Sequence, residues 1–280
     1  MSNDAIENSP DQGEPIDLYR FAYGTGATTR FTYCDSDMPV EHDVDIYTPL
    51  PIERGEINAS GSLDKTELEV EVPEDSPIAE LFLVYPPSQV VGLTIFRCHY
   101  TGSGFTIPLA VWSGRVLSCS REGYLAKLRC EPISTSMRRV GLRRHYQYMC
   151  SHVLYGTACG VNRVDHTTLT VAVGSDVRSV TVPGQISDQH LGGIVSWTPV
   201  GKPIERRTIL RVERNANNNT SRLVTAGVVR EVGPGDPVEV AKGCKHTLAD
   251  CRDVFGNAPA FGGFPYIPLQ NPHGTTAIYN

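Results

Sequence analysis

The chain has 280 residues and a formal net charge of −6, and its 40% hydrophobic and 20% charged content is that of a globular protein, not of a disordered one. The acidic balance disfavours a strongly basic nucleic-acid-binding protein. The 26 Gly and 20 Pro, together about one residue in six, exclude a helical bundle.

Residues 1–15 contain neither the positively charged nor the apolar stretch of a secretory signal, and we expect a disordered acidic arm there. The longest apolar run, near Leu81–Tyr85, is far shorter than the roughly 20 residues that span a bilayer, so we expect no membrane anchoring. We therefore expect a reducing compartment, in which cysteine spacing points to metal or thiol chemistry before disulfides.

Four runs in the first half have the features of strands. Leu68–Val72 alternates apolar and charged residues, which is the pattern of a half-buried strand. The other three are rich in β-branched and aromatic residues or alternate again: Gly92–Tyr100, Leu109–Ser118 and Tyr124–Cys130. Asp75-Ser76-Pro77 predicts the start of a short helix, and a second helix is predicted over Ser136–Tyr148.

The second half of the sequence contains the same kind of strand-like runs. Its predicted strands are Thr167–Val173, Val177–Pro183, Gly193–Pro199, Glu205–Asn215, Ser221–Ala226 and Pro237–Ala241. A third helix is predicted after Thr247, because Thr247 and Asp250 have the spacing of a capping box and Gly256 follows as a stop.

These elements predict a mainly β protein with two small antiparallel β-barrel or sandwich domains, few short helices and an irregular, cysteine-rich, metal-bound C-terminal strap. The predicted boundaries are an arm over 1–15, a first β domain over 16–145, a cysteine segment over 146–160, a second β domain over 161–242, and a second cysteine segment with the strap over 243–280.

The eight cysteines fall into two classes. Cys34, Cys98, Cys119 and Cys130 lie within or beside strand-like runs, where a cysteine is usually a small buried hydrophobe. Two pairs lie outside strand patterns and flank the second β domain: Cys150 with Cys159, and Cys244 with Cys251. Folding of that domain would bring its ends together, so we expect all four thiols to meet.

Four meeting thiolates suit two kinds of metal centre. Tetrahedral zinc needs sulfurs only about 3.8 Å apart, and it is usually bound by shorter cysteine knuckles than these. A [4Fe–4S] cluster also takes four Cys ligands and accepts wider spacing. Spacing alone leaves cluster and zinc equally open, with two disulfides as a third possibility that a reducing compartment disfavours and four unligated thiols as a fourth.

His152, His246 and Asp250 lie close to these cysteines and invite a Cys–His nucleophile interpretation, but no protease or hydrolase signature surrounds any Cys. We therefore expect them to support loops, and we predict no catalytic residue; an iron–sulfur or thiol enzyme is the alternative interpretation.

Two further segments are ambiguous. Arg138, Arg139, Arg143, Arg144 and His145 form a basic stretch, which we interpret as a solvated or interface face in preference to a DNA contact. The Gly-, Pro- and aromatic-rich run Phe255–Pro272 cannot form a regular element. It is either a strap over its own domain or a docking strap for a neighbouring subunit.

Several of these motifs resemble one family of phage proteins. The C-terminal motifs are GCKHTLADCRDVFGN and FGGFPYIPLQNP, and the upstream cysteine segment is YQYMCSHVLYGTACGV. The N-terminal half contributes YTPLPIERGEI, KTELEVEVP and LTIFRC. Over nearly the whole chain they resemble the tail-tip hub proteins of long non-contractile-tailed phages and of gene transfer agents, which include the minor tail protein L of lambda-like phages.

This resemblance implies a structural, non-enzymatic virion protein at the tail tip, assembled in the host cytoplasm. It implies a homotrimer between the distal tail protein and the central tail-tip fibre protein, with the tape-measure protein as a further candidate partner and DNA only as passing cargo. It also implies that Cys150, Cys159, Cys244 and Cys251 ligate a [4Fe–4S] cluster, and it places the cluster ahead of zinc.

Overall fold

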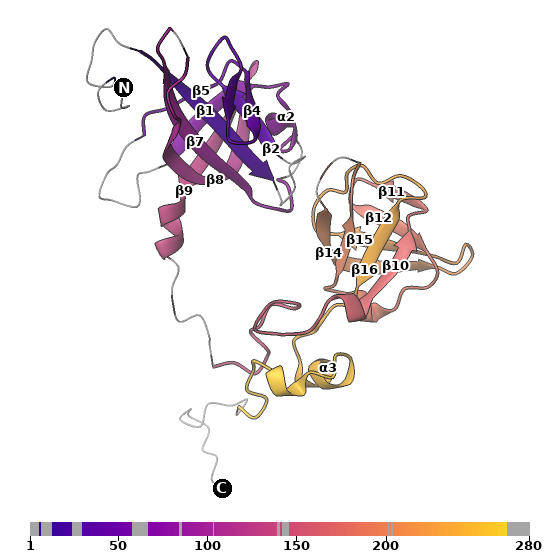
Figure 1. Ribbon diagram of the computed structural model, residues 1–280. Coiled ribbons are helices and arrows are strands. Elements are labelled where there is room, and N and C mark those ends of the chain that lie inside the picture. Colours follow the sequence, from indigo (N-terminus) through magenta and orange to yellow (C-terminus); the bar gives the residue numbers. More distant parts are fainter. Residues whose placement is uncertain are drawn as a thin grey trace. The chain divides into compact units, whose positions relative to one another are not determined.

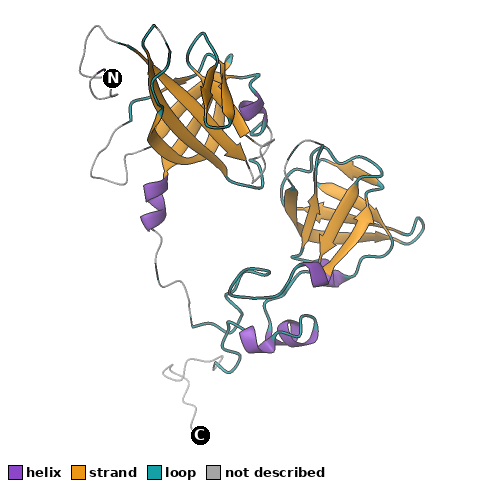
Figure 2. Cartoon of the chain, viewed as in Figure 1, coloured by secondary structure: helices purple, strands orange, loops and turns teal. Residues whose placement is uncertain are grey.

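The computed structural model describes residue 6 and residues 13–23, 30–57, 67–83, 86–102, 104–138, 141, 146–200, 202 and 204–267. The chain divides into two compact units, and each contains one β-sheet (Figures 1 and 2). Unit 1 comprises Met1–Arg139 with Val200–Glu205, and unit 2 comprises Val140–Pro199 with Arg206–Asn280.

In its described residues, unit 1 has a nine-stranded sheet of order β3-β4-β2-β1-β7-β8-β9-β6-β5. Neighbouring strands are antiparallel except β2 and β4, which pair in parallel through Tyr33 with Thr48 and Cys34 with Pro49. The strands are β1 (Glu14–Tyr23), β2 (Arg30–Cys34), β3 (Val40–His42), β4 (Asp45–Pro49), β5 (Glu53–Arg54), β6 (Leu68–Pro73), β7 (Val91–Tyr100), β8 (Leu109–Glu122) and β9 (Leu125–Pro132).

Strand β1 crosses the middle of this sheet, between β2 and β7. Tyr19 and Phe21 belong to one hydrophobic cluster, whereas Ile16 and Leu18 belong to another. With both faces of the strand covered, its residues can be apolar at successive positions, and the sequence loses the period-2 signal of a half-buried strand.

A buried ion network holds β1 to its neighbours. The Asp17 residue is only 6% exposed, and its carboxylate accepts hydrogen bonds from Arg54 Nε at 2.7 Å and Arg97 Nε at 2.9 Å. The Asp17 backbone N–H donates to the Asp35 carboxylate at 2.9 Å. One carboxylate therefore joins three segments of unit 1 across 80 residues of sequence.

Unit 2 has a seven-stranded sheet of order β10-β16-β13-β14-β15-β12-β11 among its described residues. The strands are β10 (Thr167–Val171), β11 (Gly174–Asp176), β12 (Ser179–Pro183), β13 (Ile194–Trp197), β14 (Glu205–Asn215), β15 (Thr220–Thr225) and β16 (Pro237–Ala241). Its core is a single cluster of mostly β-branched side chains that includes Val180, Val195, Ile209 and Val240, all with no exposed surface.

The helices of the described residues are short. They are α2 (Pro77–Glu80) and α3 (Leu248–Asp253), with 3-10 helices η2 (Ile133–Arg138), η3 (Val164–His166), η4 (Asp188–His190) and η5 (Ala258–Ala260). None is long and apolar enough to cross a membrane.

The mainly β fold with two sheets and few short helices is confirmed, and both sheets are antiparallel apart from the β2–β4 pair. Closure of either sheet into a barrel and the finer domain boundaries stay predictions. Strand β1 begins at Glu14, inside the segment 1–15 that we predicted to be disordered. The remaining part of the predicted arm before Gly13 lies outside the described residues, apart from residue 6.

The predicted helix over Ser136–Tyr148 is wrong where the structure describes it. The chain forms only the 3-10 helix η2, which begins earlier and ends at Arg138, and Tyr146–Tyr148 is not helical. Gly141 within this stretch has no helix-stabilising side chain, and tertiary context overrides a weak propensity. Arg139, Arg143, Arg144 and His145 of the basic stretch lie outside the described residues.

Acid should weaken unit 2 through His190. This side chain is buried, and burial holds its pKa below the ordinary value of 6.5. The folded state thus binds the proton more weakly than the unfolded state. The contribution of neutral His190 to the free energy of unfolding is therefore present above about pH 6.5 and is lost as the pH falls through the folded pKa. Urea unfolding between pH 7.5 and 5 should show a falling free energy, and His190→Leu should flatten that fall. Parallel profiles for the two proteins would contradict this.

Candidate metal centre

The first cysteine pair is placed by consecutive tight turns. Gly156 N–H donates to the Val153 carbonyl at 3.0 Å, and Cys159 and Gly160 N–H both donate to the Gly156 carbonyl. Tyr155 takes a positive φ of 61°, which reverses the chain between Cys150 and Cys159. The Tyr155 hydroxyl donates to the Lys242 carbonyl at 2.6 Å and ties these turns to the end of strand β16.

In the second pair, Cys244 precedes the capped helix α3 and Cys251 lies within it. Helix α3 begins as predicted: Thr247 Oγ1 accepts a hydrogen bond from Asp250 N–H at 3.2 Å. The Asp250 carboxylate accepts from Lys245 N–H at 2.8 Å and fixes the chain just after Cys244. Cys251 is the buried residue of this helix. The cap therefore orients Cys251 relative to Cys244.

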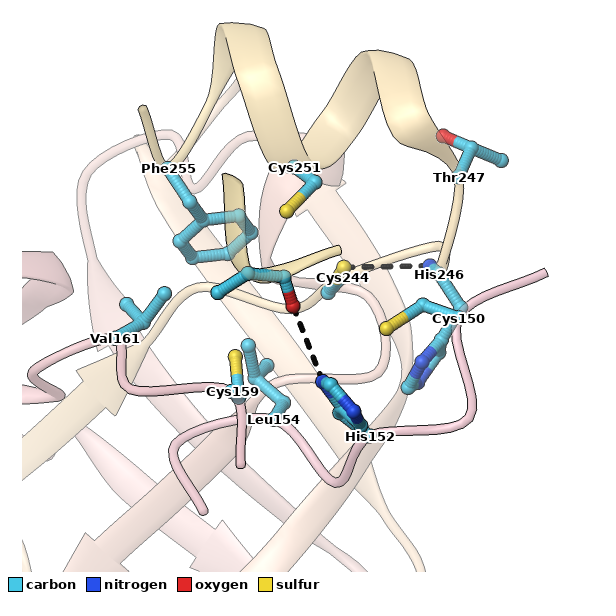
Figure 3. A pocket seen from close by; sticks show the side chains of 11 residues that line it. Cys150, His152, Leu154, Cys159, Val161, Cys244, His246, Thr247, Cys251 and Phe255 are labelled. Carbon is cyan, nitrogen blue, oxygen red and sulfur yellow. Dashed lines mark hydrogen bonds between the residues drawn. The ribbon is translucent and has the colours of Figure 1, made fainter. Parts of the chain in front are cut away.

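All four cysteines line one pocket, as predicted. Figure 3 shows their sulfur atoms around a common space, which Cys251 enters from helix α3. Cys150 N–H donates to the His246 carbonyl at 2.8 Å, which joins the two cysteine segments directly. The pocket is partly open to solvent. Its other lining residues are His152, Leu154, Val161, His246, Thr247, Phe255 and Ala260.

The thiols affect one another electrostatically. Burial raises the pKa of the Cys251 thiol, and the neighbouring Cys150, Cys244 and Cys159 act in the same direction. Burial also raises the pKa of Cys244. Four thiolates at this pocket would repel one another, so a cationic group is required to hold them all deprotonated.

Two backbone amides already point at sulfur. Gly262 N–H donates to Cys150 Sγ at 3.3 Å, and His246 N–H donates to Cys244 Sγ at 3.3 Å. Such N–H···S bonds stabilise the charged form of a sulfur ligand. Cys251 Sγ lies 3.1 Å from the Asn257 carbonyl, to which its thiol donates.

The C-terminal strap packs on its own chain as far as Ile267, where the described part ends. Asn257 Nδ2 donates to the Cys159 carbonyl at 2.5 Å, and Phe264 N–H donates to the Gln147 carbonyl at 2.9 Å. The Phe264 ring lies 4.4 Å from the Tyr146 ring. The strap therefore packs on the first cysteine segment of its own chain over residues 257–267, and docking onto a neighbouring subunit stays a prediction.

The remaining cysteines are strand residues of unit 1, as predicted. Cys34, Cys98 and Cys130 are fully buried in β2, β7 and β9, whereas Cys119 in β8 is only partly buried.

The polar neighbours of the pocket support loops. His152 Nδ1 lies 3.1 Å from the Ala260 carbonyl, His246 contributes backbone groups, and Asp250 holds Lys245. The loop-supporting role of His152 is as expected, but its close approach to Gly262 was missed from the sequence, because no spacing rule connects residues 110 positions apart.

Among the described residues, no three His, Cys, Asp or Glu side chains gather closely enough to hold a metal ion. The metal-bound character of the strap and the ligand role of the four cysteines therefore stay predictions.

The fold and the site together define a β-rich protein in which four of the eight cysteines line one pocket. The chain belongs to the family described as baseplate hub protein, N-terminal attachment domain, which matches residues 12–162, more than half of its length. A second family, phage conserved hypothetical protein BR0599, matches residues 189–271. The first match contains Cys150 and Cys159, and the second contains Cys244 and Cys251.

A solved structure shares the fold. A chain of the virion of a native gene transfer agent (GTA) particle superimposes with a TM-score of 0.75 at 16% identity, over 98% of this chain and 97% of that one. No curated protein matches the chain significantly. The resemblance to tail-tip hub proteins is thus confirmed: the chain is a structural, non-enzymatic component of the virion baseplate or tail.

Proposed function

We propose that the chain is the tail-tip hub that joins the distal tail protein to the central fibre protein, as a homotrimer. The membership in the baseplate hub family carries this proposal. The shared fold with a virion protein of a gene transfer agent over almost the full chain supports it. The tape-measure protein is a further neighbour in this arrangement, and DNA passes the hub as cargo.

We further propose that Cys150, Cys159, Cys244 and Cys251 hold a [4Fe–4S] cluster. The observation that carries this is one pocket lined by all four sulfurs. A cube has its ligands at separate corners, so four sulfurs around a pocket suit it better than the tight tetrahedron of zinc. The amides of Gly262 and His246 supply hydrogen bonds to two of the sulfurs. Structural zinc on the same residues is the alternative.

The role proposed for this centre is structural. Over their described residues, the two cysteine segments and the strap contain the six-residue helix α3, the short 3-10 helix η5 and otherwise turns, so little regular hydrogen bonding holds them. A metal centre contributes folding free energy directly in such regions, because its ligands are brought together only in the folded state. Four cysteine ligands leave no open coordination position, which fits a non-enzymatic protein.

Cross-linking and quantitative mass spectrometry of purified particles test the hub proposal. We expect cross-links from this chain to the distal tail protein and to the central fibre protein, and a copy number that fits one trimer per tail. Cross-links only to head or tail-tube proteins, or a copy number that fits one complete hexameric ring per tube layer, would contradict it.

A further inference from the structure

The strap passes the first cysteine segment at very close range. The Gly262 carbonyl accepts from Ser151 Oγ at 3.5 Å, and its N–H reaches Cys150 Sγ at 3.3 Å. Two residues earlier, the Ala260 carbonyl lies 3.1 Å from His152 Nδ1. A carbonyl oxygen can only accept, so Nδ1 carries the proton and donates. Figure 3 shows this bond beside the sulfur atoms of the pocket.

The glycine at 262 is required by the His152 ring and not by its own backbone. A Cβ on Gly262 would lie 2.5 Å from His152 Nε2 and 2.6 Å from Cε1. Gly262 does not have a positive φ, and the three atoms nearest to such a Cβ all belong to the His152 ring, so we expect an alanine to fit when the ring is absent. Gly263 differs, because its Cβ would lie 2.6 Å from the Tyr148 carbonyl, which no side-chain change removes.

We propose that His152 is a positioning residue that locks the strap onto the four-cysteine pocket and aims the Gly262 amide at Cys150. The ring acts twice: it bonds the Ala260 carbonyl, and its surface sets how closely residue 262 can approach. Its consequence for a bound cluster, protection of the Cys150 side from solvent, rests on the proposed function.

A double-mutant cycle on the full chain tests the lock. Hydrogen exchange is measured at the strap amides 261–264 in the wild type, Gly262→Ala, His152→Ala and the double variant. Each single change should raise exchange by about tenfold, whereas Gly262→Ala should add almost nothing once the ring is gone. Gly263→Ala is the matched control, since its conflict with the Tyr148 carbonyl should cost the same with or without His152.

The conservative variant His152→Asn separates the bond from the ring. The Asn side-chain amide occupies roughly the place of Nδ1 and can donate to the Ala260 carbonyl. We expect hydrogen exchange at the strap amides of His152→Asn to stay near the wild-type rate. Adding Gly262→Ala to His152→Asn should raise that exchange as little as adding it to His152→Ala. In iron-loaded protein, His152→Ala should shorten the lifetime of the visible absorbance in air by about tenfold, and His152→Asn should restore it.

Two outcomes are distinguishable. Additive effects of Gly262→Ala and His152→Ala in the exchange experiment would overturn the lock and leave the cluster proposal intact. A wild-type chain without iron would overturn the cluster proposal, and the exchange cycle on that metal-free chain would still decide the lock. Iron-loaded His152→Ala with the wild-type lifetime in air would refute the protective role of the strap.

Discussion

Replacing any one of the four pocket cysteines by Ser should abolish the metal centre and block tail completion. These cysteines are Cys150, Cys159, Cys244 and Cys251. A structural metal contributes on the order of 10 kcal/mol of folding free energy in small domains, so its loss should unfold the cysteine segments and the strap. The sheet of unit 2 has its own core and should survive. Metal content, strap proteolysis and infectious titre are the measurements.

Cys119→Ser is the matched control, because Cys119 is a partly buried thiol of β8 outside the pocket. It should keep its metal content and produce normal particles. Infectious particles from any of the four ligand variants would contradict the proposed role of the centre.

The second large effect should come from Asp17→Ala in unit 1, which we expect to lower the free energy of unfolding by about 3–5 kcal/mol. Asp17 is the carboxylate that pairs with both Arg54 and Arg97, and its removal leaves two partly buried guanidinium groups without it. Chemical unfolding followed by circular dichroism measures the change.

An exposed ion pair in the same unit gives the control. Glu67 and Arg129 are paired at 2.6 Å, but both side chains are more than half exposed, so Glu67→Ala should cost less than about 1 kcal/mol. Equal losses in the free energy of unfolding for Asp17→Ala and Glu67→Ala would show that the buried network contributes no more to stability than an exposed ion pair.

Most strands of the second half could be predicted closely from the sequence, but β11 lies between two predicted runs and was missed. Strands β14 and β16 have the predicted bounds, because one face of each is buried and turn residues such as Asn217 separate neighbouring strands. Strands β1 to β5 were missed. β1 is covered on both faces and carries the buried Asp17, so its sequence lacks the alternation on which such a prediction depends.

The site could be predicted in part. The spacing of Cys150, Cys159, Cys244 and Cys251 around one β domain was sufficient to predict that they meet, and the capping pattern at Thr247 predicted helix α3. The contact between His152 and Gly262 could not be predicted, because it arises from a tertiary approach of two irregular segments. Irregular backbone follows no periodic sequence pattern, and only the fold brings its residues together.

The most direct test of the account is iron and acid-labile sulfide analysis, with a visible spectrum, on the full chain purified without oxygen. We expect a brown protein with broad visible absorbance and about four iron and four sulfide ions per chain. Each ligand variant should be colourless, and Cys119→Ser should be brown. A colourless wild-type chain that carries stoichiometric zinc, or no metal at all, would contradict it.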